Sequence, residues 1–219
     1  NIVISHDPPA GNDHIYLNQV LGLFSDCCFN DQLIAINIKS DGSPVTKADI
    51  GSEQLIASKL KKNFSYPIVS EETPVKYNER KKWEKYWLVD PLDGTQDFIG
   101  QTDEFTVQFA LIYNNQPILG IVYAPALDLM YTGQIKKGAC KNGKRIFNRS
   151  KRKKLIAADS RHNSSKETVA FLNKYNVTKV IRAGSALKLC YLAEGKIDVY
   201  PRFNGTKEWD TAASHLICN

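Results

Sequence analysis

The chain is organised around one segment, Trp87-Leu88-Val89-Asp90-Pro91-Leu92-Asp93-Gly94-Thr95. Residues 86–89 are aromatic or apolar and end in a β-branched valine, a pattern that predicts a strand. Two acids, a proline that fixes φ and a glycine free to adopt positive φ follow within six residues. We therefore expect Asp90 and Asp93 on a tight turn at the mouth of the strand. Carboxylates that converge in this way are the ligands that hard divalent cations prefer.

An ordinary polar turn is the simpler interpretation of this segment, because Asp, Pro and Gly are the commonest turn residues. That interpretation suits an isolated Asp-Pro pair. The complete run Asp-Pro-Leu-Asp-Gly-Thr directly after an apolar strand is much more specific. Gly94 has no side chain, so a phosphate is able to approach the backbone closely at this point.

Composition indicates a folded protein of one large domain or two closely packed subdomains. The chain has 219 residues, of which 42% are hydrophobic and 10% aromatic, enough to form a core and too many for a disordered chain. We expect no integral membrane segment, because no apolar run approaches the roughly 18 residues of a membrane span. We also expect no secretory signal, because residues 1–7 contain neither a basic region nor a cleavage pattern.

Five cysteines without metal-binding spacing predict free thiols in a reducing compartment, and hence a cytoplasmic protein. Peripheral association with the inner membrane stays open. The net charge of +6 suits either a polyanion or small anionic substrates. Part of this charge is the run Lys151-Arg152-Lys153-Lys154, which we expect to form a solvated face or linker.

The residues before the central segment predict two helices and a strand. One helix is expected over residues 14–29 and a second from Thr46 to about Lys62, with apolar side chains at four-residue spacing. Thr46 and Asp49 resemble a capping box, so Asp49 is as easily a helix cap as a catalytic group. Residues 67–70 predict a strand that ends at Glu71-Glu72, and residues 76–84 an exposed connection.

The residues after the central segment change character near residue 150. Alternating strands at 105–111, 118–123 and 129–135, with a hairpin turn at 141–144, predict an antiparallel meander. Beyond residue 150 strands and helices alternate, which is typical of an α/β unit. These are strands 155–158, 180–183 and 197–200, and helices 164–175, capped by a box starting at Ser164, 185–194 and from 208 onward. We expect subdomains 1–150 and 151–219.

The second half offers groups that suit an anion. Gly184-Ser185 lies between a strand and a helix, where free N–H groups at the helix start hold phosphates. Lys188, one turn later, is placed to reach the same anion. The alternatives are an ordinary helix cap and a surface lysine. His162 follows a strand end, Arg202 follows Tyr200-Pro201, and Asp210 opens a helix, where acids are favoured in any case.

Together these signals describe carboxylates at strand and helix ends in the first half and anion-binding groups in the second. This combination is what metal-dependent hydrolysis of a phosphate ester requires.

Three motifs resemble the signatures of the inositol monophosphatase superfamily: Asp90-Pro-Leu-Asp-Gly-Thr, the upstream Glu71-Glu72 and the downstream Trp209-Asp-Thr-Ala-Ala. Further segments are similar to its bacterial 3'(2'),5'-bisphosphate nucleotidase branch, namely Ser43-Pro-Val-Thr-Lys-Ala-Asp49, Glu104-Phe-Thr-Val, Pro117-Ile-Leu-Gly-Ile-Val-Tyr-Ala-Pro and Tyr200-Pro-Arg-Phe. The resemblance runs from about residue 43 to the end.

The resemblance implies a layered αβαβα sandwich and two to three Mg²⁺ ions, with Li⁺ as an inhibitor. Glu71, Asp90 and the Leu92 carbonyl would hold one ion; Asp90, Asp93 and Asp210 would hold a second; a third, weaker ion would touch Glu71. Thr95, backed by Asp49, would orient the attacking water and help to deprotonate it.

The nucleotidase branch also implies how the substrate is held. Its contacts would come from Gly94, Thr95, His162, Ser185, Lys188, Arg202 and Asp210. The joint presence of His162, Ser185, Lys188 and Arg202 favours 3'-phosphoadenosine 5'-phosphate as substrate over inositol phosphate, with AMP as the product. An inositol-phosphate or sugar-phosphate phosphatase of the same fold stays the alternative, and a non-catalytic polyanion-binding protein that uses the basic run at 151–154 is a remote one. We expect a small phosphorylated nucleotide as partner, no nucleic acid, and a monomer or homodimer.

Members of this superfamily continue for some tens of residues past the Trp-Asp signature, whereas this sequence ends at Asn219. We therefore expect the C-terminal end to be incomplete.

Overall fold

The structure is a computed structural model that describes residues 36–40, 42–148, 152–175 and 177–219. The helix predicted over residues 14–29 and the boundary predicted near residue 150 lie outside these residues. The described cysteines Cys140, Cys190 and Cys218 are free thiols, as expected. No helix in the described ranges is long and apolar enough to cross a membrane.

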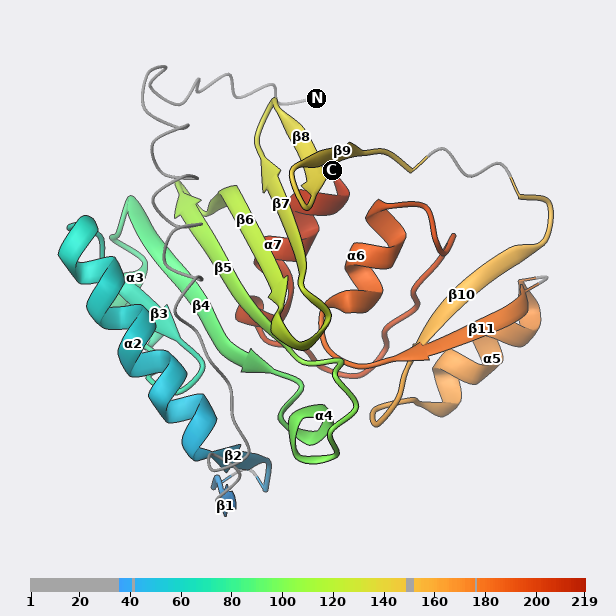
Figure 1. Cartoon of the computed structure of the whole chain (residues 1–219), viewed down its shortest axis with the longest axis horizontal. Helices are drawn as coiled ribbons and strands as arrows, with labels where there is room; N and C mark the ends of the chain where they lie inside the picture. The colour runs from blue at the N-terminus through green and yellow to red at the C-terminus, as the bar shows by residue number, and fades with distance from the viewer. Residues whose placement is uncertain (1–35, 41, 149–151, 176) are drawn as a thin grey trace.

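A seven-stranded sheet forms the centre of the molecule, with its strands side by side in chain order (Figure 1). β3 and β4 are parallel, joined across the short helix α3 (Tyr77–Arg80), and every later neighbour is antiparallel. The predicted meander and its hairpin at 141–144 are confirmed. The strands are β3 (Ile68–Ser70), β4 (Lys85–Asp93), β5 (Thr106–Tyr113), β6 (Gln116–Ala124), β7 (Leu129–Gln134), β8 (Gly138–Lys141) and β9 (Lys144–Ile146).

Strand alternation sends the side chains of β4 into two separate cores. Trp87 and Val89 face α2 (Lys47–Asn63) and pack with its apolar stripe. Tyr86 and Leu88 face the opposite side, where they belong to the core of α6 (Leu187–Ala193) and α7 (Glu208–Cys218). The sheet is therefore covered by helices on both faces, which explains why residues 86–89 of β4 are all aromatic or apolar.

The remaining elements complete five layers, seen in succession across Figure 1. β10 (Leu155–Ser160) and β11 (Val177–Ala183) form a parallel pair beyond α6 and α7, and α5 (Lys166–Lys174) packs outside them. The order α2, large sheet, α6 with α7, small sheet, α5 is the predicted αβαβα sandwich. A small hairpin, β1 (Ile36–Ile38) with β2 (Pro44–Thr46), leads into α2.

Three local predictions need correction. The strand predicted over residues 86–89 continues to Asp93. The helix cap of α5 is Ser165, whose hydroxyl accepts from the Thr168 N–H at 3.2 Å, because the Ser164 hydroxyl donates instead to Asp159. Residues 197–200 form only a single bridge, from Val199 to Ala157, rather than a strand.

Two glycines allow α7 to lie directly on the large sheet. A Cβ atom on Gly120 in β6 would overlap the Ala213 backbone, and one on Gly133 in β7 would lie 2.9 Å from the Ile217 Cα. Real Cβ atoms do not approach backbone this closely, so a larger residue would push α7 away from the sheet.

We predict that Gly120→Ala destabilises the protein by about 1–3 kcal/mol, the usual cost of overpacking a well-packed contact. The matched control is Gly51→Ala, because Gly51 is exposed in α2 with open space around it. Alanine there should stabilise by about 0.5–1 kcal/mol, since it favours the helix. Urea unfolding measures both changes. An unchanged midpoint for Gly120→Ala would contradict the close packing of α7.

Candidate active site

A β-bulge in β4 places Asp90 and Asp93 on the same face of the sheet. Asp90 pairs with Gln108 and Asp93 with Thr106, so three steps along β4 match two along β5. One extra residue in a strand reverses the side on which the following side chains point. Both carboxylates consequently face the layer of α6 and α7, although their sequence spacing would put them on opposite faces of a regular strand.

Three donors, two from β5 and one from the turn before α6, hold the carboxylate of Asp93. Its Oδ2 accepts from the Ala186 N–H at 2.6 Å, from Gln108 Nε2 at 2.9 Å and from Thr106 Oγ1 at 3.3 Å. The buried Asp90 accepts through Oδ1 from the Leu92 N–H at 3.1 Å. These bonds fix one oxygen of each aspartate.

Two further acids come from other elements. Glu71 directly follows β3, and its backbone N–H donates to the Val89 carbonyl. Asp210 is in the first turn of α7, where its Oδ2 accepts from the Lys207 N–H at 2.8 Å. Lys39 pairs with Glu71 at 2.8 Å and with Glu72 at 2.7 Å.

Burial and crowding raise the pKa values of the three aspartates. Burial raises the pKa of Asp90 well above its usual value, with a further increase from the charges of Asp93, Glu71 and Asp210. Burial and the Asp210 charge raise the pKa of Asp93 to about 7. The pKa of Asp210 is raised chiefly by burial. Burial alone would lower the pKa of Lys39, but its bonds to Glu71 and Glu72 raise it.

This donor set fits a divalent cation, because crowded buried carboxylates lose much of their mutual repulsion when a cation neutralises them. Within the ranges that the structure describes, no three acidic, imidazole or thiol groups already stand close enough together to hold an ion. Partner bonds direct some of the oxygens elsewhere: Asp210 caps α7 and Glu71 pairs with Lys39. Which oxygens bind a metal therefore stays a prediction.

Thr95 lies beside these acids, at the start of α4 (Thr95–Ile99). Gly94 precedes it with φ of 90°, a left-handed conformation that glycine adopts without strain. The Thr95 hydroxyl donates to Asp49 Oδ1 at 3.1 Å. Asp49 Oδ2 meanwhile accepts from the Thr46 N–H at 2.7 Å, so the predicted capping box of α2 is confirmed. One buried carboxylate thus serves both the helix and Thr95.

A cavity of about 490 Å³ joins the acidic groups to the second half of the chain. Nine of the predicted site residues line it: Glu71, Asp93, Gly94, Thr95, His162, Ser185, Lys188, Arg202 and Asp210. Asp49, Asp90 and Leu92 are not in the lining but are almost fully buried behind it, where they contact residues of the wall or one another.

Lys188 is a buried residue in the lining of the same cavity. Its ammonium donates to the carbonyls of Ser185 at 2.6 Å and Ala183 at 3.1 Å, and it lies 5.5 Å from the centre of the Tyr200 ring. Burial lowers the pKa of Lys188 to about 8, against the pull of Asp93. The lysine therefore holds the turn around Ser185 in place and also adds positive charge to the cavity.

The N–H groups after β11 differ from the prediction. They were expected to be free for a phosphate, but Gly184 N–H donates to Glu104, Ala186 N–H to Asp93, and Leu187 N–H to the Ser185 hydroxyl. Ser185 itself has a positive φ of 44° and precedes the helix rather than capping it. In this conformation the turn binds carboxylates of its own chain.

Arg202 and His162 also line the cavity. The Nε of Arg202 is buried and has no hydrogen-bond partner among the described residues. His162 follows β10, and its Nε2 lies 3.2 Å from Asp97 Oδ1. An arginine N–H without a partner at a cavity wall suits an anionic ligand.

Lys39, Asp97, Glu104 and Gln108 were not predicted as residues of the site. Asp97 and Glu104 stand within or next to recognised motifs, and Gln108 is, with Thr106, a polar residue on the inner face of an otherwise apolar strand. These signals were available in the sequence. Lys39 carries no comparable signal, because its role depends on where the β1–β2 hairpin lies.

We predict that the metal-free protein loses stability as the pH rises from about 4 to about 7. Asp93 ionises in the unfolded chain near its usual pKa of about 3.9, but in the folded protein only at about 7. Between these values the unfolded state has given up the proton and the folded state has not, so unfolding becomes easier. Asp93→Asn should reduce this decline by more than about 1 kcal/mol.

Urea unfolding at pH 5 and pH 7.5 in chelator tests this prediction, with the exposed Asp103→Asn as control. Added Mg²⁺ should restore stability at pH 7.5 in the unmodified chain and less so in Asp93→Asn. An equal decline in the unmodified chain and both variants would show that the crowded aspartates do not govern it.

Comparison with known proteins agrees with this geometry. A family model described as the inositol monophosphatase family matches residues 20–219. The 3'(2'),5'-bisphosphate nucleotidase CysQ of Escherichia coli K12 is 43% identical over 183 residues, which cover 82% of this chain and 74% of the relative. The CysQ of Haemophilus influenzae is 34% identical over 220 residues, covering 94% and 81%.

A solved structure extends the likeness to three dimensions. The crystal structure of CysQ from Bacteroides thetaiotaomicron, described as a bacterial member of the inositol monophosphatase family, matches with a TM-score of 0.73 and 34% identity. The match covers 91% of this chain and 80% of that one. Motifs, fold and relatives therefore agree that the chain belongs to the inositol monophosphatase family, whose members are metal-dependent phosphatases that typically use Mg²⁺.

Proposed function

We propose that this protein is a Mg²⁺-dependent 3'(2'),5'-bisphosphate nucleotidase that hydrolyses 3'-phosphoadenosine 5'-phosphate to AMP and phosphate. The main support is that carboxylates and cationic groups line one cavity. We call Glu71, Asp93 and Asp210, with Thr95, the acidic wall, and Lys188, Arg202 and His162 the cationic wall. The similarity to CysQ relatives supports the same choice.

The acidic wall would take the phosphate that is removed. Glu71, Asp90 and the Leu92 carbonyl would hold one Mg²⁺, and Asp90, Asp93 and Asp210 a second, with Glu71 also at a weaker third. Bound Mg²⁺ would neutralise the carboxylates, polarise the phosphate and lower the pKa of a coordinated water. We expect Li⁺ to inhibit by competing for these ligands.

Thr95 and Asp49 would act on the attacking water. The hydroxyl of Thr95 already donates to Asp49 Oδ1, so its lone pairs are directed away from Asp49 and are available to a water in the cavity. A proton from that water would pass through the hydroxyl to the carboxylate as the new P–O bond forms. The bond from phosphorus to the 3'-oxygen breaks, and that oxygen takes up a proton to become the 3'-hydroxyl of AMP.

The cationic wall would take the phosphate that is retained. Arg202 offers a buried N–H without a partner among the described residues, and Lys188 adds positive charge beneath Ser185. A phosphate monoester has about two negative charges near neutral pH, so it gains from both. Inositol monophosphate has no second phosphate for this wall to bind.

A non-catalytic polyanion-binding protein would depend on the basic run at 151–154. The structure describes only its last three residues, and there Arg152 pairs with Asp198 at 3.1 Å and with the Gly195 carbonyl at 3.0 Å. That arginine serves the fold, and the acidic wall would have no purpose in such a protein. A phosphatase, in contrast, has a use for both the acidic and the cationic residues of the cavity.

We predict Mg²⁺-dependent, Li⁺-inhibited phosphate release from 3'-phosphoadenosine 5'-phosphate, at least about tenfold faster at low substrate than from inositol 1-phosphate. A tenfold preference corresponds to about 1.4 kcal/mol, less than a charged hydrogen bond to the second phosphate supplies. Both substrates are assayed with Mg²⁺, with chelator and with added Li⁺.

Asp90→Asn is the matched variant, because it keeps the shape of a buried side chain and removes its charge. It should abolish turnover while the protein stays folded by circular dichroism. Preference for inositol 1-phosphate would be consistent with a Mg²⁺-dependent phosphatase but would refute a bisphosphate nucleotide as its substrate. No turnover of either substrate by the folded, unmodified protein would refute both.

A further inference from the structure

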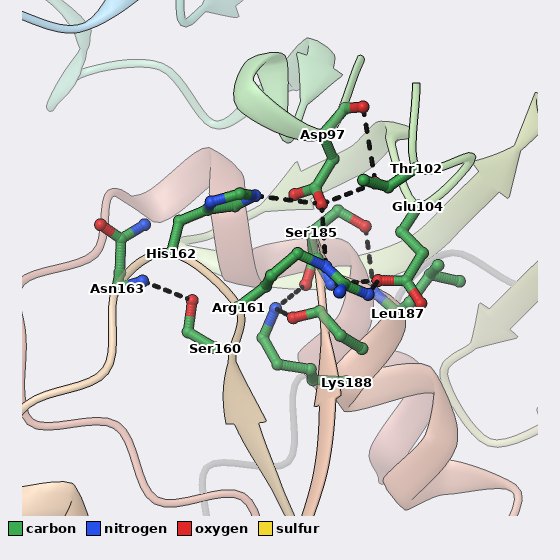
Figure 2. A network of polar contacts seen from close by, with 12 residues as sticks. Asp97, Thr102, Glu104, Ser160, Arg161, His162, Asn163, Ser185, Leu187 and Lys188 are labelled. Carbon is green, nitrogen blue, oxygen red and sulfur yellow. Dashed lines mark hydrogen bonds and ion pairs between the residues drawn. The ribbon is translucent and has the colours of Figure 1, made fainter. Parts of the chain in front are cut away.

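A second network of charged groups lies at the edge of the cavity (Figure 2). At its centre is Asp97 of α4, two residues after Thr95, with a side chain only 2% exposed. Its Oδ1 accepts from Thr102 Oγ1 at 2.8 Å and faces His162 Nε2 at 3.2 Å and Arg161 Nε at 3.4 Å. Three groups therefore contact one buried oxygen, and two of them, Arg161 and His162, come from the loop after β10.

Glu104 gives the network a second carboxylate. Its Oε2 accepts from Arg161 Nη2 at 2.6 Å and from the Gly184 N–H at 2.8 Å. The segment that follows β4 therefore holds both the loop after β10 and the turn after β11. These two places carry the predicted nucleotide contacts His162 and Ser185.

The packing around Asp97 leaves it little freedom. A Cβ atom on Gly184 would overlap the Asp97 carboxylate, so only glycine permits this approach. Asp97, His162 and Gly184 all line the cavity, whereas Arg161 is not part of its lining. Figure 2 shows Arg161 between the carboxylates of Asp97 and Glu104 and the imidazole of His162 directed at Asp97 from the other side. The network therefore presents the imidazole, rather than the guanidinium, at the cavity wall.

The network links the two walls through α4, a helix that has little stability of its own. α4 has five residues, too short to form alone, so its place depends on tertiary contacts. Thr95 at one end of this helix contacts Asp49, and Asp97 one half-turn on contacts His162 and Arg161. Asp97 therefore ties Thr95 to His162 of the cationic wall, beside the Asp93–Ala186 bond that ties β4 to the turn held by Lys188.

We infer that Asp97, supported by Glu104, is a positioning residue that sets the spacing between the phosphate that reacts and the phosphate that is retained. It thereby determines the preference of the site for a bisphosphate over a monophosphate. This inference rests on the proposed function. Charge-assisted hydrogen bonds of this kind are worth about 10-fold to 100-fold in affinity, and a wall displaced by about 1 Å loses a comparable factor.

Asp97→Asn tests the inference with two substrates that differ only in the second phosphate. These are 3'-phosphoadenosine 5'-phosphate and adenosine 3'-monophosphate, compared by kcat/KM in the presence of Mg²⁺. The loss should be at least about tenfold greater for the bisphosphate, and it should appear mainly as a higher KM. Arg161→Met, at a half-exposed position, breaks both ion pairs and should give the same pattern if Asp97→Asn folds poorly.

Asp103→Asn is the matched control, because Asp103 lies exposed in the same segment and has a positive φ that asparagine tolerates. It should keep the substrate preference of the unmodified enzyme. An equal loss for both substrates in Asp97→Asn and Arg161→Met would overturn the inference, because it would mean that Asp97 acts only through Thr95 or the fold.

Calorimetric binding of AMP and of adenosine separates this inference from the proposed function, since neither measurement needs turnover. Asp97→Asn should weaken AMP at least about tenfold more than adenosine. Selective loss of AMP binding in a protein that does not hydrolyse the bisphosphate would refute the proposed reaction and support the role of Asp97. Unchanged AMP affinity would overturn that role even in an active enzyme.

Discussion

The main constraint on this site is the free-energy cost of burying several carboxylates close to one another. Asp90, Asp93 and Asp210 lie within electrostatic reach of one another where the large sheet borders the layer of α6 and α7, and burial raises the pKa of each. Unpaired buried charge is expensive, so the surrounding chain supplies donors wherever it is able. The Ala186 N–H, the amide of Gln108, the Lys207 N–H and the ammonium of Lys39 all serve this purpose. A cation would neutralise the negative charge that appears when these carboxyl groups ionise.

The layered fold brings these groups together from distant parts of the sequence. Glu71 follows one strand, the bulge in β4 turns Asp93 toward Asp90, and Asp210 arrives on α7, which lies against the sheet through Gly120 and Gly133. Ala186 joins them because the turn after β11 lies against the end of β4. Packing of α7 and the turn on the sheet therefore matters for the site as much as the acids themselves. A small displacement of either would separate the charges from the groups that hold them.

Features that depend on local sequence pattern were predicted correctly, whereas features that depend on tertiary contacts were missed. The segment around Asp90, the capping box of Thr46 and Asp49, the meander and the layered architecture all follow from spacing, periodicity and family resemblance, and the structure confirms them. The bulge was missed because an extra residue in one strand is visible only beside its partner. The N–H groups around Ala186 were expected to be free because the sequence does not reveal that Asp93 and Glu104 lie against them. The capping serine of α5 was wrong by one position, since Asp159 competes for Ser164.

On this structure, the acidic wall becomes a phosphate site only when a cation neutralises it. Calorimetric titration of the protein with inorganic phosphate, in chelator and then in Mg²⁺, measures this dependence. We expect no measurable binding in chelator, because the carboxylates repel the anion, and clear binding in Mg²⁺ that disappears in Asp90→Asn. Phosphate binding of equal strength with and without Mg²⁺, unaffected by Asp90→Asn, would contradict this dependence.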